Sequence, residues 1–195
     1  MAIAFTPQER NRITDALLTA ARHCACTIGL KKTTLETLTQ QSGISKSMFY
    51  AFFPSKEHLF LQVYAQWHRE IFDDAQAALQ QAQAMPPHER AAYTLEHTFT
   101  ALSQSEMLHN FLEDWPLLER KLPPDEMQAV AQMDMCLVST LIAQADVRLC
   151  VPVEDAIAIV RILLMSLRVH STVGEPFHRA LSLLVRAACA QCIAA

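Results

Sequence analysis

The sequence predicts an all-α protein, and three observations support this fold class. Only three of the 195 residues are glycine, apolar residues recur at helical spacing almost throughout, and the turn residues that a sheet needs are scarce. The hydrophobic content of 51% is enough for a substantial core, in one domain or two small ones. Helices packed on helices are therefore expected along the whole chain.

The first helix has a clear start. Thr6 and Glu9 form a capping-box pattern, in which the threonine hydroxyl accepts from the Glu9 N–H and the glutamate reaches back to Thr6. Apolar residues then follow on one face to about Cys26. Gly29 allows the positive φ that commonly ends a helix.

Two short helices follow. Thr33 or Thr34 is expected to cap the second helix, which Gly43 ends. Ser45 is expected to cap a third helix that runs to about Phe53. This order of helix, tight turn and helix can place the latter helix in the major groove of DNA.

The rest of the chain reads as a larger helical body, with about nine helices in the protein altogether. Prolines separate the helical patterns or occupy their first turns, where the missing N–H costs little. We expect a DNA-binding domain at 1–54 and a helical domain at 55–195. The expected helices of the second domain span 56–84, 88–104, 106–115, 124–146, 153–171 and 176–193.

Charge divides the chain in the same way. The net charge of −4 is unusual for a DNA-binding protein. However, residues 1–60 contain seven basic and four acidic side chains, a net charge of +3, which leaves −7 for the remainder. A small positive module on an acidic body is expected, so the local field matters more than the total.

Residues 12–64 contain several short motifs that belong together. They are Ala20-Ala21, Gly29, Thr33-Thr34, Gly43-Ile44-Ser45, Phe49-Tyr50 and Phe53-Pro54-Ser55-Lys56-Glu57. This segment resembles the N-terminal domain of the tetracycline-repressor (TetR) family of transcription regulators. The resemblance covers about a quarter of the chain, and the remainder is similar only in its helical layout.

The resemblance implies a role for each matching residue. The helix from Ser45 to Phe52 would be the recognition helix, and departures from the family pattern at Met48, Ala51 and Phe52 leave the operator sequence open. Base-edge contacts would come from Lys46, Ser47 and Met48, and phosphate contacts from Tyr50, Lys56, Thr33 and Thr34. Free N–H groups at helix N-termini favour such phosphate contacts independently.

The resemblance also implies a small-molecule effector site in the body. Asp134 interrupts an apolar stripe, so it would either pair with an arginine or histidine or face the effector. The candidate lining residues, each of which could equally be ordinary core, are Trp67, Phe99, Met107, Phe111, Trp115, Met133, Asp134 and Met165.

The function predicted is that of a homodimeric transcription regulator, a repressor released from a near-palindromic operator by its effector. Dimerisation is expected through 153–171 and 176–193. An enzyme is disfavoured because no phosphate loop, metal-ligand pair or nucleophile motif is present; a helical protein-interaction module is the other alternative. No cofactor or metal is expected.

The chain is expected to be cytoplasmic, without a signal peptide or membrane span. Arg161 and Arg168 interrupt its most apolar helix. The six cysteines are expected to be reduced, as buried inert thiols or as a redox or metal sensor. They are Cys24, Cys26, Cys136, Cys150, Cys189 and Cys192.

Overall fold

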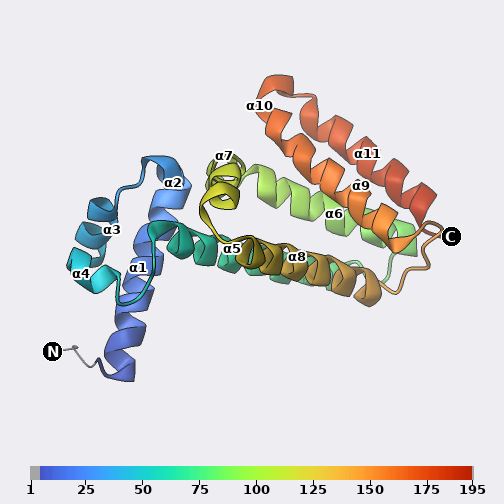
Figure 1. Ribbon diagram of the computed structural model, residues 1–195. Helices are drawn as coiled ribbons and strands as arrows, with labels where there is room; N and C mark the ends of the chain where they lie inside the picture. Colours follow the sequence, from blue (N-terminus) through green and yellow to red (C-terminus); the bar gives the residue numbers. More distant parts are fainter. Residues whose placement is uncertain (1–4, 195) are drawn as a thin grey trace. The chain divides into compact units, whose positions relative to one another are not determined.

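The computed structural model describes residues 5–194, except for the side chains of residues 131, 133 and 134. The described part is helical, as predicted, and its only β pairing is an isolated antiparallel bridge between Leu149 and Ile193. The helices (Figure 1) are α1 (Pro7–Thr27), α2 (Gly29–Lys32), α3 (Leu35–Ser42), α4 (Lys46–Phe49), α5 (Lys56–Gln81), α6 (Pro87–Ser103), α7 (Glu106–Lys121), α8 (Pro124–Gln144), α9 (Val153–Ser166), α10 (His170–Val173) and α11 (Phe177–Cys192).

The chain forms two compact units, and each contains two separate stretches of sequence. The first unit comprises the residues up to Trp67 together with Glu106–Met127. The second comprises His68–Ser105 and the residues from Gln128 onward. Helices α5 and α8 therefore contribute residues to both units. The functional boundary at residue 54 stays a prediction, because compactness groups residues by contact and not by function.

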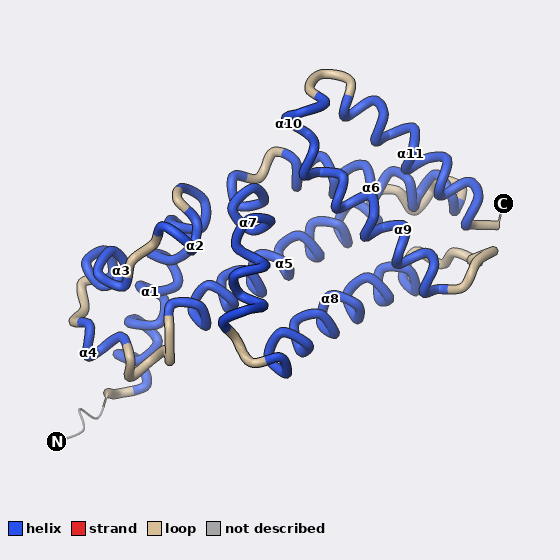
Figure 2. Tube along the Cα trace, turned by 45° about the horizontal axis from the view of Figure 1, so that its top comes forward, coloured by secondary structure: helices blue, strands red, loops and turns tan. Residues whose placement is uncertain are grey.

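The first unit is built around α1. Its Thr6 capping box is present, with the Glu9 N–H donating to Thr6 Oγ1 at 3.2 Å and the Thr6 N–H donating to Glu9 Oε2 at 2.9 Å. The apolar face of α1, including the fully buried Leu17 and Ala21, packs against α3 and α7. Figure 2 shows α1 between these elements and α2 beside α7.

Several helices differ from the sequence prediction, among them the helix expected at 153–171, which ends as α9 at Ser166. Helix α7 continues through Pro116 to Lys121, although an interior proline was expected to end it. The missing N–H removes one backbone hydrogen bond, but Leu118 and Leu122 beyond it are buried, which offsets that cost. Helix α4 ends at Phe49 and continues as a turn, and the short helix α2 was not predicted.

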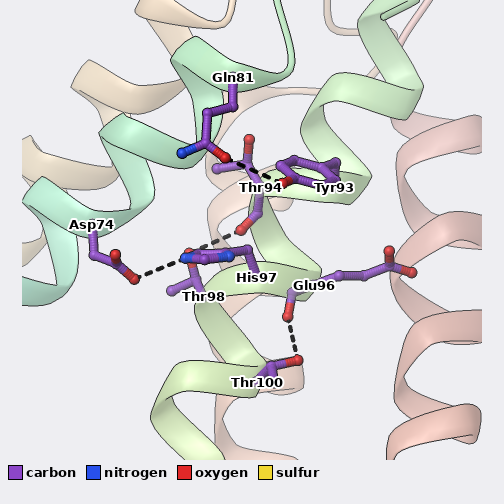
Figure 3. A network of polar contacts seen from close by, with 8 residues as sticks. All are labelled: Asp74, Gln81, Tyr93, Thr94, Glu96, His97, Thr98 and Thr100. Carbon is purple, nitrogen blue, oxygen red and sulfur yellow. Dashed lines mark hydrogen bonds and ion pairs between the residues drawn. The ribbon is translucent and has the colours of Figure 1, made fainter.

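In the second unit, α11 packs on α6 and α9. Glu96 of α6 joins two residues of α11: its carboxylate accepts from Ser182 Oγ at 2.5 Å and pairs with Arg186 Nη2 at 2.7 Å. On another side of α6, His97 Nε2 lies 3.1 Å from Asp74 Oδ2 of α5 (Figure 3). Polar contacts thus tie α6 to both neighbouring helices.

The α9 to α11 region exposes apolar side chains. Leu183 and Ile162 are 70% and 69% exposed. The segment Val153–Val173 is long and apolar enough to cross a membrane by length and composition alone, with a mean hydropathy of 1.6 and 17% of its apolar window buried. It is not one continuous α-helix, because a 3₁₀ turn at Leu167–Val169 separates α9 from α10.

Candidate nucleic-acid interface

Local hydrogen bonds define the helix–turn–helix of α3 and α4. Thr34 caps α3, since its Oγ1 accepts from the Thr37 N–H at 3.0 Å. Gly43 ends α3 with φ +69°, and Ser45 Oγ accepts from the Met48 N–H at 3.2 Å to start α4. The caps predicted at Ser45 and at Thr34, one of two candidates, are confirmed.

Most of the predicted DNA-contacting side chains lie on the surface of this motif. Phe49 is fully buried and anchors α4, while the next residue, Tyr50, is 57% exposed. Met48 is half-buried. The exposed candidates are Thr34, Ser45, Lys46, Ser47 and Tyr50. The structure thus brings together polar and basic groups that can approach a nucleic acid.

Thr33 requires a correction. Its side chain is only 1% exposed, and its Oγ1 donates to the Gly29 carbonyl at 2.6 Å. Its N–H also donates within α2, to Gly29 and Leu30. A phosphate cannot reach these groups, so Thr33 closes α2 while Thr34 alone caps α3.

Lys56 has internal partners that its sequence motif did not reveal. Its Nζ donates to the Leu30 carbonyl at 2.9 Å and to the Thr33 carbonyl at 2.5 Å. The side chain is half-buried. An ammonium group has three donors, so one remains for a phosphate.

Asp114 of α7 was missed by the sequence prediction. This carboxylate is 2% exposed and accepts from the Leu30 N–H at 2.6 Å, the Lys31 N–H at 3.3 Å and the Tyr64 hydroxyl at 2.7 Å. Burial, followed by the nearby Asp114 charge, raises the pKa of Tyr64 above its usual value, so the hydroxyl stays protonated and donates. Asp114 interrupts the buried face of α7 formed with Met107 and Leu118, a signal that was available in the sequence.

Of the predicted effector-site residues, three aromatic side chains meet in the first unit. The Phe111 ring lies 5.4 Å from that of Trp67 and 5.2 Å from that of Trp115. Trp115 Nε1 donates to Glu119 Oε1 at 2.9 Å. Met107 is buried in the same unit.

The remaining effector candidates belong to the second unit. Phe99 is buried, whereas Met165 is 46% exposed on α9. The side chains of Met133 and Asp134 lie outside the described part of the protein, so the alternatives for Asp134 stay open. Within the described residues, no group of three or more His, Cys, Asp or Glu side chains could hold a metal ion.

Comparison with known proteins supports the same reading of residues 17–63. This segment matches the family model described as "Bacterial regulatory proteins, tetR family". No curated protein sequence matches the chain. The match agrees with the predicted DNA-binding segment of a TetR-type transcription regulator in this part of the chain.

Solved structures resemble the chain over nearly its whole length. A TetR transcriptional regulator from Rhodococcus sp. RHA1 has 16% identity and a TM-score of 0.60, covering 93% of this chain and 96% of that one. A TetR-family regulator from Marinobacter aquaeolei VT8 has 14% identity and a TM-score of 0.60, with 97% and 100% covered. FadR from Bacillus subtilis, in complex with stearoyl-CoA, has 12% identity and a TM-score of 0.63, with 93% and 98% covered. At these identities the similarity shows a shared fold.

Proposed function

We propose that this chain is a TetR-family DNA-binding regulator of transcription, as the match of residues 17–63 supports, and that it is a repressor which a small-molecule effector releases from a near-palindromic operator. The observation that carries the proposal is the α3–α4 motif, with Lys46, Ser47 and Tyr50 exposed on its surface around the buried anchor Phe49. A short helix with an exposed N-terminal turn suits the major groove.

Each exposed group has a chemical role in this proposal. Lys46 donates to a guanine edge, Ser47 bonds to a base, and Met48 packs on a thymine methyl group. Phosphates are bound by the Tyr50 hydroxyl, the Thr34 and Ser45 helix starts, and the one free donor of Lys56. These contacts position the motif, while the base contacts specify the sequence.

The exposed apolar side chains support a homodimer through the α9–α11 region. Leu183, Leu184, Ile162 and Met165 are all at least 46% exposed, a costly arrangement for a monomer. A second copy would cover them with the same surface, and two recognition helices would then read two half-sites. Coverage by a second copy would also account for the apolar segment Val153–Val173.

The aromatic cluster of Trp67, Phe111 and Trp115 supports an effector site with an apolar aromatic wall. Met107 belongs to the same unit and is a further proposed lining residue. Phe99, Met133, Asp134 and Met165 stay predictions from the sequence. A structural neighbour was solved with resorcinol and another with stearoyl-CoA, so this fold accepts ligands of very different size. Release requires that the effector bind better to the state that fits the operator less well.

Selection of binding sequences from random duplex DNA, followed by anisotropy titration on the selected site, tests the proposal. We expect a near-palindromic site, affinity that falls steeply with salt, and roughly tenfold or greater weakening in Tyr50→Phe. The variant Gln80→Glu, at an exposed position of α5, is a control. Failure to select any site, or binding that salt does not weaken, would favour the helical interaction module instead.

A further inference from the structure

Helix α2 has only four residues, yet side chains distant in sequence hold both of its ends. A helix this short has too few internal hydrogen bonds to be stable alone. Its partners come from α7, which lies beside it, and from α5 (Figure 1). Because α2 leads directly into Thr34, the cap of α3, its position sets where the helix–turn–helix begins.

Asp114 holds the amino end of α2. Both of its oxygens accept from backbone amides, those of Leu30 at 2.6 Å and Lys31 at 3.3 Å. Hydrogen bonds to a charged acceptor are stronger than neutral ones, and burial increases the penalty for losing them. The Tyr64 hydroxyl, at 2.7 Å, completes the set of described donors to this carboxylate.

Asn110, one turn before Asp114 on α7, holds the end of α1. Its Nδ2 donates to the Ala25 carbonyl at 2.8 Å. Between these contacts, Gly29 adopts φ +73°, and a Cβ there would lie 3.2 Å from both Asn110 Oδ1 and Asp114 Oδ2. Glycine is therefore needed both for the backbone conformation and for the close approach of α7.

Lys56 holds the carboxyl end of α2 by donating to the Leu30 and Thr33 carbonyls. Lys56 begins α5, and Tyr64 lies two turns further along the same helix. Helix α5 thus supports α2 directly through Lys56 and indirectly through the Tyr64 bond to Asp114.

We propose that Asp114 is a positioning residue for operator recognition, through which α7 fixes α2 and hence the start of the helix–turn–helix. The inference rests on the proposed DNA-binding role. Asp114 lies between Phe111 and Trp115 in sequence, and Tyr64 packs on the Phe111 ring at 5.1 Å. A ligand that displaces these aromatic side chains would move the carboxylate that holds α2.

The test compares Asp114→Asn, which keeps the shape but removes the charge, with Glu113→Gln, the same chemical change at the exposed neighbouring residue. We expect Asp114→Asn to weaken binding to the selected operator by about tenfold or more, with Glu113→Gln unchanged. Affinity for random duplex DNA and the slope of log K against log salt should change much less, because the substitution removes no cationic side chain. Wild-type operator affinity in Asp114→Asn, or an equal loss of affinity for random duplex DNA, would overturn the proposal.

Amide hydrogen exchange on the free dimer gives a second readout that needs no DNA. Exchange should accelerate in peptides covering residues 28–34 and remain unchanged in α6 and α11. Wild-type exchange in residues 28–34, or equal acceleration everywhere, would refute the positioning role. If the wild type binds no DNA but the local acceleration occurs, the DNA-binding proposal fails while the Asp114 contact to α2 stands.

Tyr64→Phe keeps the test decisive if Asp114→Asn does not fold. This variant removes one donor to the carboxylate and retains the ring. It should show the same local acceleration to a smaller degree, together with weaker operator binding. Wild-type values for both measurements would count against the proposal.

Discussion

The two compact units differ in what they leave on their surfaces. The first unit buries apolar residues such as Leu38 and Phe49 and exposes polar groups on α3 and α4. The second exposes large aliphatic side chains such as Leu183 and Ile162. A polar surface rich in free donors suits a charged duplex, whereas an apolar surface suits another apolar surface. Exposed side chains therefore indicate a nucleic-acid contact in the first unit and a protein–protein contact in the second.

The largest effect is expected at the apolar surface of the second unit. Leu183→Glu combined with Ile162→Glu should yield a folded monomer, because two buried charges per subunit would oppose association. Operator affinity should then fall by about 10²–10⁴-fold, since two linked half-sites become one. Sedimentation velocity and anisotropy measure these effects, with Gln80→Glu as a control that adds one negative charge at an exposed position of α5. A dimer that survives the double substitution would assign the interface elsewhere.

At the polar surface, the expected effect is smaller. Lys46→Ala should weaken operator binding by about 1–3 kcal/mol and relax preference at one base pair, since a base contact is lost. The oligomeric state should not change, because Lys46 belongs to the first unit and the exposed apolar side chains belong to the second. Binding to a panel of single-base operator variants checks this. Uniform weakening across the panel would instead identify Lys46 as a phosphate contact.

Two glycines of the first unit share a left-handed backbone conformation but differ in their surroundings. Gly29 and Gly43 have nearly equal φ values of +73° and +69°, but a Cβ at Gly43 meets nothing within 4 Å. Gly43→Ala should lower the free energy of unfolding by about 1 kcal/mol, the cost of left-handed backbone. Gly29→Ala should cost about 1–3 kcal/mol because Asn110 and Asp114 must also move. Urea denaturation of both variants measures the difference. Equal decreases in the free energy of unfolding would show that Asn110 and Asp114 of α7 can move away from residue 29 at little cost.

The smallest effect concerns a thiol of the second unit. Burial, with smaller contributions from Cys192 and Glu96, raises the pKa of Cys189 to about 11 from 9.0. Above pH 9 the unfolded chain releases this proton while the folded chain retains it, so the free energy of unfolding should decrease between pH 9 and 11. In Cys189→Ala, urea denaturation under reducing conditions should show a shallower decrease.

Labelling with a thiol reagent at pH 8 provides the matching kinetic measurement. The exposed Cys136 and Cys150 should react well before Cys189, because the thiolate is the reactive form. Rapid labelling of Cys189 in the folded protein would contradict its burial in α11.

Short-range signals in the sequence predicted the helix–turn–helix well. The caps at Thr6 and Ser45 and the turn at Gly43 each involve groups within a few residues of one another, and all are present in the structure. The resemblance to the TetR family implied phosphate contacts for both Tyr50 and Thr33, and of these Tyr50 is exposed. Thr33 is buried because it closes α2, a helix held by residues far along the chain.

The sequence by itself determined the all-α class, the caps and the helix–turn–helix, because helical periodicity and capping act between near neighbours. Only the tertiary structure decided that Asp114 and Lys56 hold α2, because Leu30 and Asp114 are separated by 84 positions. It also decided that α7 continues through Pro116, since the burial of Leu118 depends on what packs against it. Contacts between distant residues depend on where the helices meet, which local pattern does not specify.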